Sequence, residues 1–158
     1  MLSILLVLVG LNHAEAQAGP YRDIQPGPFG AGVIVGPTTG VSLAWRPNGW
    51  NAVQGAVGWD LKDGRFDASA DYVQSIRLLE PTGGTMMPLY VGVGVGAVSA
   101  APGMFGENAG VSARVPVGAS LFFERLPLEL FAQVVPRVQV IPGLGFGVDA
   151  GLGGRFYF

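Results

Sequence analysis

The sequence predicts an all-β fold, an eight-stranded antiparallel up-and-down β-barrel. Apolar and polar residues alternate with a period of two along eight segments, and this is the period of a strand, because successive strand side chains point to opposite faces. Turns rich in glycine and proline separate these segments. The charged residues of the segments gather on one of the two phases, so the predicted sheet has one apolar and one polar face.

The composition limits the class of protein. The chain has 158 residues, of which 49% are hydrophobic and 13% charged, with a mean hydropathy of +0.43. Despite 26 glycines and 12 prolines, these values favour one folded domain over a disordered chain. Nine Lys and Arg residues against eleven Asp and Glu residues form no basic field for phosphates, so we expect no nucleic-acid partner. The absence of cysteine excludes disulfides, thiol catalysis and zinc knuckles.

The N-terminus predicts an export signal. Leu2 to Leu11 form an apolar run, and small residues follow it where a signal peptidase cuts, after Ala16 or Ala18. The run is too short to cross a hydrocarbon layer as a helix, which takes about 20 residues. We therefore expect residues 1–18 to be a signal peptide and residues 19–158 to be the barrel domain. Cleavage also removes His13, and the mature chain then contains no histidine.

The alternation is clear in residues 146–158, 111–124 and 87–98, and noisier elsewhere. From residue 146 to 158, one phase reads Phe, Val, Ala, Leu, Gly, Phe, Phe, and the other reads Gly, Asp, Gly, Gly, Arg, Tyr. The predicted strands, in chain order, are Phe29–Gly36, Val41–Arg46, Asn51–Asp60, Arg65–Arg77, Met87–Val98, Val111–Glu124, Leu128–Arg137 and Phe146–Phe158. The predicted turns are Pro37–Gly40, Pro47–Gly49, Lys62–Gly64, Pro81–Gly84, Gly103–Gly110, Arg125–Pro127 and Pro142–Gly143.

Residues 81–106 allow a rival interpretation, because they carry no charge over 26 positions and could form a membrane helix. Gly92 and Gly96 even have the spacing of a helix-packing motif. The window also holds seven glycines and three prolines, which are costly inside a helix, and its Val-Gly repeat has a strict period of two. We therefore predict a strand.

The charged phase predicts which face of the barrel is inside. It holds five acids and five bases, namely Asp67, Asp71, Glu124, Glu129 and Asp149 with Arg46, Arg77, Arg114, Arg137 and Arg155. Balanced charge suits a narrow lumen, where each buried ion needs a partner of opposite sign to offset its desolvation. Glycines on the same phase leave room for arginines. The apolar phase then faces outward, as in a transmembrane barrel.

Aromatic residues support the same orientation. Along an up-and-down path they gather near two rims, Phe29, Trp45, Trp50, Phe123, Phe156 and Phe158 at one, and Trp59, Phe66, Phe105 and Phe146 at the other. Two such girdles are typical of a protein that crosses a bilayer. The alternative is that hydrophobic strand ends simply carry aromatic residues.

Several motifs resemble known proteins. The last strand, with apolar residues at alternate positions and a final Phe158, looks like the assembly signal of bacterial outer-membrane barrels. Further motifs are Gly32–Ser42, Pro88–Gly92, Arg114–Gly118, Pro127–Pro136 and Asp149–Phe158. Together they resemble a family of small uncharacterised outer-membrane β-barrel proteins also known from spirochaetes. The resemblance implies an eight-stranded barrel like that of OmpX or the OmpA membrane domain, in a family with no assigned activity.

The sequence offers little for catalysis. Barrel enzymes of this size use a serine or aspartate activated by histidine, which the mature chain would lack. Asp67 and Asp71 share a face, but four strand residues separate them by ~13 Å, beyond glycosidase geometry. Asp60 to Gly64 lacks the third acid and distal glutamate of a calcium loop, so we predict a hairpin turn there.

Two ion pairs are predicted inside the barrel instead. Glu129 and Arg155 should meet near one rim, and Arg137 and Asp149 toward the other, as bridges that stiffen the lumen. A pore is disfavoured because eight strands leave an interior that side chains fill.

The leading hypothesis is an integral protein of the cell outer membrane, non-enzymatic, with a structural or surface-interaction role. We expect no catalytic residue, cofactor or metal, and a monomer whose partners are the lipid bilayer and the barrel-assembly machinery. The alternative is a periplasmic or secreted calycin-like barrel that binds an apolar ligand inside. A third hypothesis, a histidine-free enzyme on a membrane barrel, lacks the usual bases.

Overall fold

The computed structural model describes residues 27–60, 64–79, 84–99 and 109–158. The predicted signal peptide, residues 1–18, lies outside these residues. The described part of the chain forms one antiparallel sheet of nine strands. They are β1 (Phe29–Val35), β2 (Thr38–Trp45), β3 (Asn51–Asp60), β4 (Phe66–Leu79), β5 (Thr85–Ser99), β6 (Gly110–Arg114), β7 (Val117–Phe123), β8 (Leu126–Ile141) and β9 (Gly145–Tyr157).

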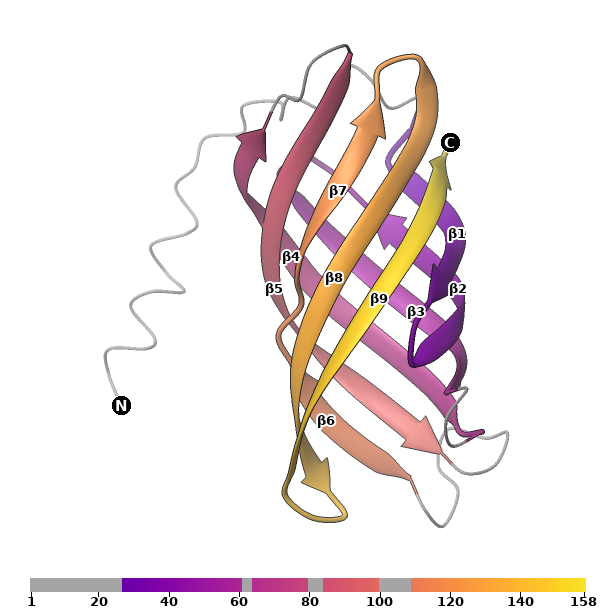
Figure 1. Ribbon diagram of the computed structural model, residues 1–158, viewed down its shortest axis with the longest axis vertical. Helices are drawn as coiled ribbons and strands as arrows, with labels where there is room; N and C mark the ends of the chain where they lie inside the picture. The colour runs from indigo at the N-terminus through magenta and orange to yellow at the C-terminus, as the bar shows by residue number, and fades with distance from the viewer. Residues whose placement is uncertain (1–26, 61–63, 80–83, 100–108) are drawn as a thin grey trace.

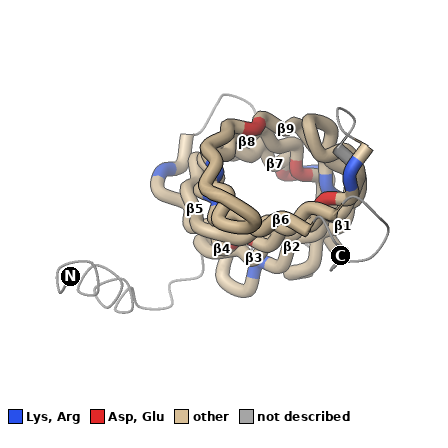
Figure 2. Tube along the Cα trace, turned by 90° about the horizontal axis from the view of Figure 1, so that it is seen from below, with Lys and Arg blue, Asp and Glu red and all other residues tan. Residues whose placement is uncertain are grey.

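The sheet closes on itself into a ring (Figure 1; Figure 2). Neighbours in sequence pair along most of the chain, and the ring is completed where the first strand, β1, pairs with the last, β9. At this seam the backbone N–H of Phe158 donates to the carbonyl of Phe29 over 2.9 Å. The all-β antiparallel prediction is therefore confirmed.

The predicted strand Val111–Glu124 is divided into β6 and β7, which raises the strand number from eight to nine. Pro116 lies between the two pieces and has no N–H to give to a strand ladder. Both pieces still pair with β5 on one side and β8 on the other. The Pro116 carbonyl accepts from the Gly92 N–H at 2.8 Å, so the wall stays connected across the break.

The segment that could have been a helix is a strand over the residues described. β5 covers Thr85–Ser99, including the Val-Gly repeat, and residues 100–106 lie outside the described residues. No helix in residues 27–60, 64–79, 84–99 or 109–158 is long and apolar enough to cross a membrane.

The two faces of the sheet differ as the alternation predicts. In β2, Val41, Leu43 and Trp45 are 53%, 54% and 45% exposed. The residues between and after them, Ser42, Ala44 and Arg46, are 0%, 5% and 4% exposed. The apolar phase of this strand therefore faces outward, and the polar phase faces into the ring.

Most of the ten charged residues predicted inside are buried or half-buried, but the prediction is wrong for Arg77 and Glu124, which are exposed. The pairing of β4 with β5 shifts by one residue between Ser75 and Arg77, and such a bulge turns the residues beyond it to the other face. Glu124 stands in the turn after β7, beyond the strand alternation.

Aromatic residues occur at both ends of the ring. Phe29 pairs with Trp45 at the end of the ring where Phe158 lies, and both are exposed. At the opposite end Trp59 and Phe66 pair, with ring centroids 5.9 Å apart in an edge-to-face arrangement. Phe105 lies outside the described residues.

Glycines make room for large side chains inside the ring. Three buried aromatic residues each lie against a glycine paired with them on the neighbouring strand, Tyr157 against Gly30, Tyr90 against Gly118, and Phe131 against Gly153. A Cβ added at any of these glycines would collide with the aromatic ring. The small residues thus permit the dense filling of a narrow interior.

We predict that Gly118→Ala destabilises the fold by about 1–3 kcal/mol, the usual cost of overpacking. The added Cβ would lie 2.6 Å from the Tyr90 hydroxyl. The matched control is Gly143→Ala, because nothing lies within 4 Å of a Cβ there. Urea unfolding followed by tryptophan fluorescence measures both variants, and equal stabilities would contradict the packing described.

Candidate functional site: a buried polar network

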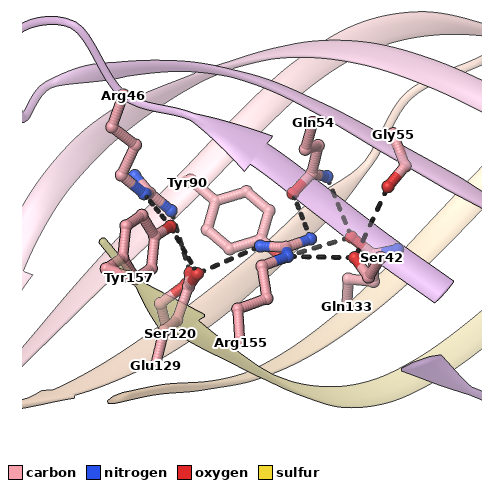
Figure 3. A network of polar contacts seen from close by, with 10 residues as sticks. All are labelled: Ser42, Arg46, Gln54, Gly55, Tyr90, Ser120, Glu129, Gln133, Arg155 and Tyr157. Carbon is pink, nitrogen blue, oxygen red and sulfur yellow. Dashed lines mark hydrogen bonds and ion pairs between the residues drawn. The ribbon is translucent and has the colours of Figure 1, made fainter. Parts of the chain in front are cut away.

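The interior is organised around Glu129 on β8, whose side chain is 0% exposed (Figure 3). A carboxylate has two oxygens and about four acceptor positions. Four donors of the described residues reach these oxygens: Arg46 Nη2 at 2.9 Å and Ser120 Oγ at Oε1, and Arg155 Nη1 at 3.1 Å and Tyr157 Oη at 2.7 Å at Oε2. The carboxylate is therefore saturated with hydrogen bonds.

Arg155 on β9 connects Glu129 to strands on the far side of β1. Its Nε donates to Ser42 Oγ over 2.9 Å, and its Nη2 donates to Gln54 Oε1 over 3.1 Å. The guanidinium also lies 3.9 Å from the centre of the Phe131 ring, within range of a cation–π contact. One arginine thus joins β8 and β9 to β2 and β3.

Arg46 follows directly after β2 and enters the ring from its end. Its backbone N–H donates to the Pro28 carbonyl at 2.8 Å, which holds it in register with the start of β1. Its Nε donates to Tyr157 Oη over 2.9 Å, and its guanidinium lies 5.2 Å from the Phe122 ring centre. Tyr157 therefore accepts from Arg46 while it donates to Glu129.

Two glutamines extend the network toward the middle of the ring. Gln54 Nε2 donates to Gln133 Oε1 at 3.1 Å, and the Tyr90 hydroxyl donates to the same oxygen at 3.2 Å. The Tyr90 contact adds β5 to the strands already joined, so the network touches most strands of the ring.

A second set of charges lies toward the other end. Asp71 on β4 pairs with Arg114 on β6 at 2.9 Å, and Arg137 on β8 pairs with Asp149 on β9 at 3.2 Å. Asp67 accepts from the Thr38 hydroxyl at 2.9 Å. The Arg137–Asp149 pair is the more open, with side chains 33% and 24% exposed.

The structure confirms both predicted ion pairs, Glu129 with Arg155 and Arg137 with Asp149. Sequence reasoning placed Arg46 inside but missed its pairing with Glu129, because the two residues are 83 positions apart. It also missed the uncharged members, which are Ser42, Gln54, Tyr90, Ser120, Gln133 and Tyr157. Tyr157 lies on the same face of its strand as Arg155, and this shared face was the sign in the sequence that Tyr157 belongs to the network.

The network suits structure better than catalysis. Glu129 has its acceptor positions occupied by hydrogen-bond donors, which makes it a poor proton acceptor for a substrate. Asp67 and Asp71 have separate partners and form no pair with each other in the contacts described. Within the described residues, no group of three His, Cys, Asp or Glu could hold a metal ion. Most of the Asp60–Gly64 segment lies outside those residues.

A cavity of about 20 Å³ lies inside the ring among Ile34, Thr38, Arg114, Gln133 and Asp149. This volume is near that of a single water-sized sphere, so it has no room for an organic substrate.

Comparison with known proteins finds no matching family model, no matching curated protein and no matching solved structure.

We predict that Glu129→Ala destabilises the fold by about 3–5 kcal/mol, because it leaves two buried guanidinium groups without their shared counter-charge. Asp149→Ala is the matched control. It removes a carboxylate from a partly exposed pair, where the loss is about 0–1 kcal/mol. Urea unfolding measures the difference, and a small effect of Glu129→Ala would show that the network contributes little.

Proposed function

We propose that this protein is an integral outer-membrane β-barrel with a non-enzymatic, structural or surface-interaction role. In this proposal, β6 and β7 act as one interrupted strand, so the wall has eight transmembrane strands. The observation that carries the proposal is the inverted distribution of side chains, with large apolar residues exposed and charged residues buried.

The outer wall has the chemistry that a bilayer requires. Its exposed apolar residues occur on almost every strand, among them Val33, Leu43, Val57, Tyr72, Val93, Val134 and Leu152. A soluble protein rarely exposes apolar patches larger than a few hundred Å². Hydrocarbon contact makes such a surface favourable, and it explains why the charges lie inside.

The strand lengths support a membrane position. A tilted strand crosses the hydrocarbon layer with about 9–11 residues. β3 has 10 residues, β4 has 14, β5 has 15, β8 has 16 and β9 has 13, whereas β1 and β2 are shorter, with 7 and 8. The exposed aromatic residues at the two ends of the ring suit the two interfaces of a bilayer.

The interior favours this proposal over the calycin-like carrier. A carrier of an apolar ligand needs an apolar cavity of about 300 Å³ or more. The centre of the ring holds Glu129, Arg155 and Gln133, and the cavity beside Gln133 has a volume of only about 20 Å³. The same filling opposes a pore for solutes.

The expected partners are lipids and the barrel-assembly machinery, which would read the last strand and Phe158. The expected location is the cell outer membrane, reached through the signal peptide 1–18. The proposal thus describes a small outer-membrane barrel of the kind that the sequence motifs resemble.

The localisation test is fractionation followed by electrophoresis of boiled and unboiled samples. We expect the protein in the outer-membrane fraction, extractable only with detergent, and a different mobility in the two lanes, because a closed barrel resists the detergent until heated. Extraction in buffer alone would overturn the membrane proposal.

A charged residue on the outer wall tests the orientation directly. We predict that Val93→Lys destabilises the protein in lipid vesicles by about 2–4 kcal/mol if the residue lies near the bilayer midplane. Val93 is exposed on β5, whereas Leu144, in the turn between β8 and β9, serves as the control through Leu144→Lys. Urea unfolding in vesicles compares them. A soluble carrier would tolerate both substitutions equally.

A further inference from the structure

Arg77 on β4 is an exception to the inward placement of charge. Seven other charged strand residues have polar partners on the inner face, namely Asp67, Asp71, Arg114, Glu129, Arg137, Asp149 and Arg155. Arg77 is exposed on the outer face, and it forms no ion pair with another residue of the described ranges. It therefore places an unpaired positive charge on a wall that is mainly apolar.

A bulge in β4 turns Arg77 outward. The pairing of β4 with β5 shifts between Ser75 and Arg77, which leaves Ile76 as the extra residue. Ser75 is buried, and Leu78 packs against buried residues inside the ring. Ile76 and Arg77 between them are both exposed. Without the extra residue, strict alternation would place Arg77 inside, so the bulge is what re-aims its side chain.

Arg77 lies close to one end of the ring. β4 ends two residues later, at Leu79, and in Figure 1 this end is the upper one, where the C-terminus also lies. Trp50 lies beside the bulge, because its carbonyl accepts from the Ser75 N–H at 2.8 Å, and its side chain is exposed. Tryptophan favours the headgroup level of a bilayer. In the membrane proposal, Arg77 therefore stands at the level of the lipid headgroups.

Two amide side chains share this part of the outer face. Gln74 precedes the bulge, and Asn51 on β3 is its cross-strand partner. Gln74 follows buried Val73 and Asn51 precedes buried Ala52, so both face outward. Each amide nitrogen can donate two hydrogen bonds. We call Asn51, Gln74 and Arg77 the Arg77 patch, and it is rich in hydrogen-bond donors.

An apolar groove follows the Arg77 patch toward the middle of the wall. Val53, the next outward residue of β3 after Asn51, lines this groove together with Leu43, Trp45 and Ala70. The groove has a volume of about 350 Å³ and opens on the outer face, where Leu43, Trp45 and Val53 are exposed. The wall is thus polar near its end and apolar further in, which is the order of headgroup and acyl chain in a lipid leaflet.

We propose that the Arg77 patch binds the phosphate of an anionic phospholipid, one of whose acyl chains lies in this groove. A guanidinium suits a phosphate because its N–H groups can donate to two oxygens at once. The unpaired positive charge favours a headgroup with a net negative charge over a zwitterionic one. This inference deepens the proposed function, on which it rests, by naming the class of lipid that the wall selects.

The surroundings of Arg77 favour a lipid over a dissolved anion. Ile76 is 63% exposed next to it, and its partner on β5 is Leu89. A dissolved phosphate would leave this apolar surface in water, whereas a lipid covers it. Arg125 offers a contrast, because it is exposed at the same end of the ring but stands in the turn between β7 and β8.

Native mass spectrometry of the purified protein, released from detergent micelles, tests the site. The probes are phosphatidylglycerol and phosphatidylcholine with the same acyl chains, offered in equal amounts. We expect phosphatidylglycerol to bind about tenfold more tightly, and Arg77→Gln to abolish this preference. Arg77→Lys keeps the charge without the planar fork and should retain part of the preference. Arg125→Gln is the matched control and should retain all of it.

Three results would overturn the proposal. The first is an undiminished preference in Arg77→Gln. The second is an equal loss in Arg125→Gln, which would show that the charge of the whole end attracts the lipid. The third is displacement of the lipid by inorganic phosphate, which would show that the patch binds the free ion.

Arg77→Gln should fold, because Arg77 has no ion-pair partner among the described residues. The difference in mobility between boiled and unboiled samples checks this. A variant that fails to fold would show that the fold needs the Arg77 side chain, and it would refute the assignment of Arg77 as a free lipid-binding group.

Ala70→Phe tests the groove. Ala70 is exposed on β4, so a phenylalanine there fills the groove from outside without entering the ring. We expect phosphatidylglycerol to bind about tenfold more weakly, the effect of roughly two displaced methylene groups. Ala68→Phe is the matched control, because Ala68 lies on the same face of β4 and does not line the groove. Unchanged binding by Ala70→Phe would refute the placement of the acyl chain.

These outcomes are separable from those of the membrane proposal. A protein in the outer-membrane fraction that binds both lipids equally would refute this inference and leave the membrane role standing. Extraction in buffer alone would refute the membrane role, whatever the lipid preference. Arg77→Gln should fractionate like the unchanged protein, because the patch selects a lipid and the whole apolar wall holds the barrel in the bilayer.

Discussion

The interior of this protein depends on one carboxylate shared by two guanidinium groups. Glu129 is fully buried and meets both Arg46 and Arg155. Burial of an unpaired charge is costly, so each arginine can lie inside only because this carboxylate is there. The hydroxyls of Ser120 and Tyr157 complete its hydrogen bonds, and this satisfaction of every acceptor is what makes a charged core acceptable.

The charged core and the apolar wall have one cause, because successive side chains of a strand point to opposite faces of the sheet. With Ser42, Arg46 and Glu129 inside, the alternate residues of their strands must face outward, and these are mainly valine, leucine and aromatic residues. The three small hydrophobic clusters inside, around Phe122, Phe131 and Tyr90, fill space between polar groups. An interior of this kind favours rigidity.

Periodicity was sufficient to predict the strands and most inward-facing residues, because a period of two is a local property of the chain. It failed at Arg77, where a bulge between Ser75 and Arg77 shifts the phase, and at Pro116, where the strand divides. It identified Glu129 with Arg155 because they lie on strands joined by one hairpin. The contacts of Arg46 with Glu129 and of Arg155 with Ser42 depend on ring closure and therefore left no local signal.

The seam between β1 and β9 has a consequence for the order of assembly. Arg155 reaches Ser42 across 113 positions, and Arg46 reaches Tyr157 across 111. Contacts so distant in sequence carry a large loop-closure entropy and form slowly. Hairpins can form early from neighbouring strands, but the polar core can be completed only when the final strand docks. β9 is therefore the strand that closes both the sheet and the polar network, and hairpins formed without it leave Glu129 without Arg155 and Tyr157.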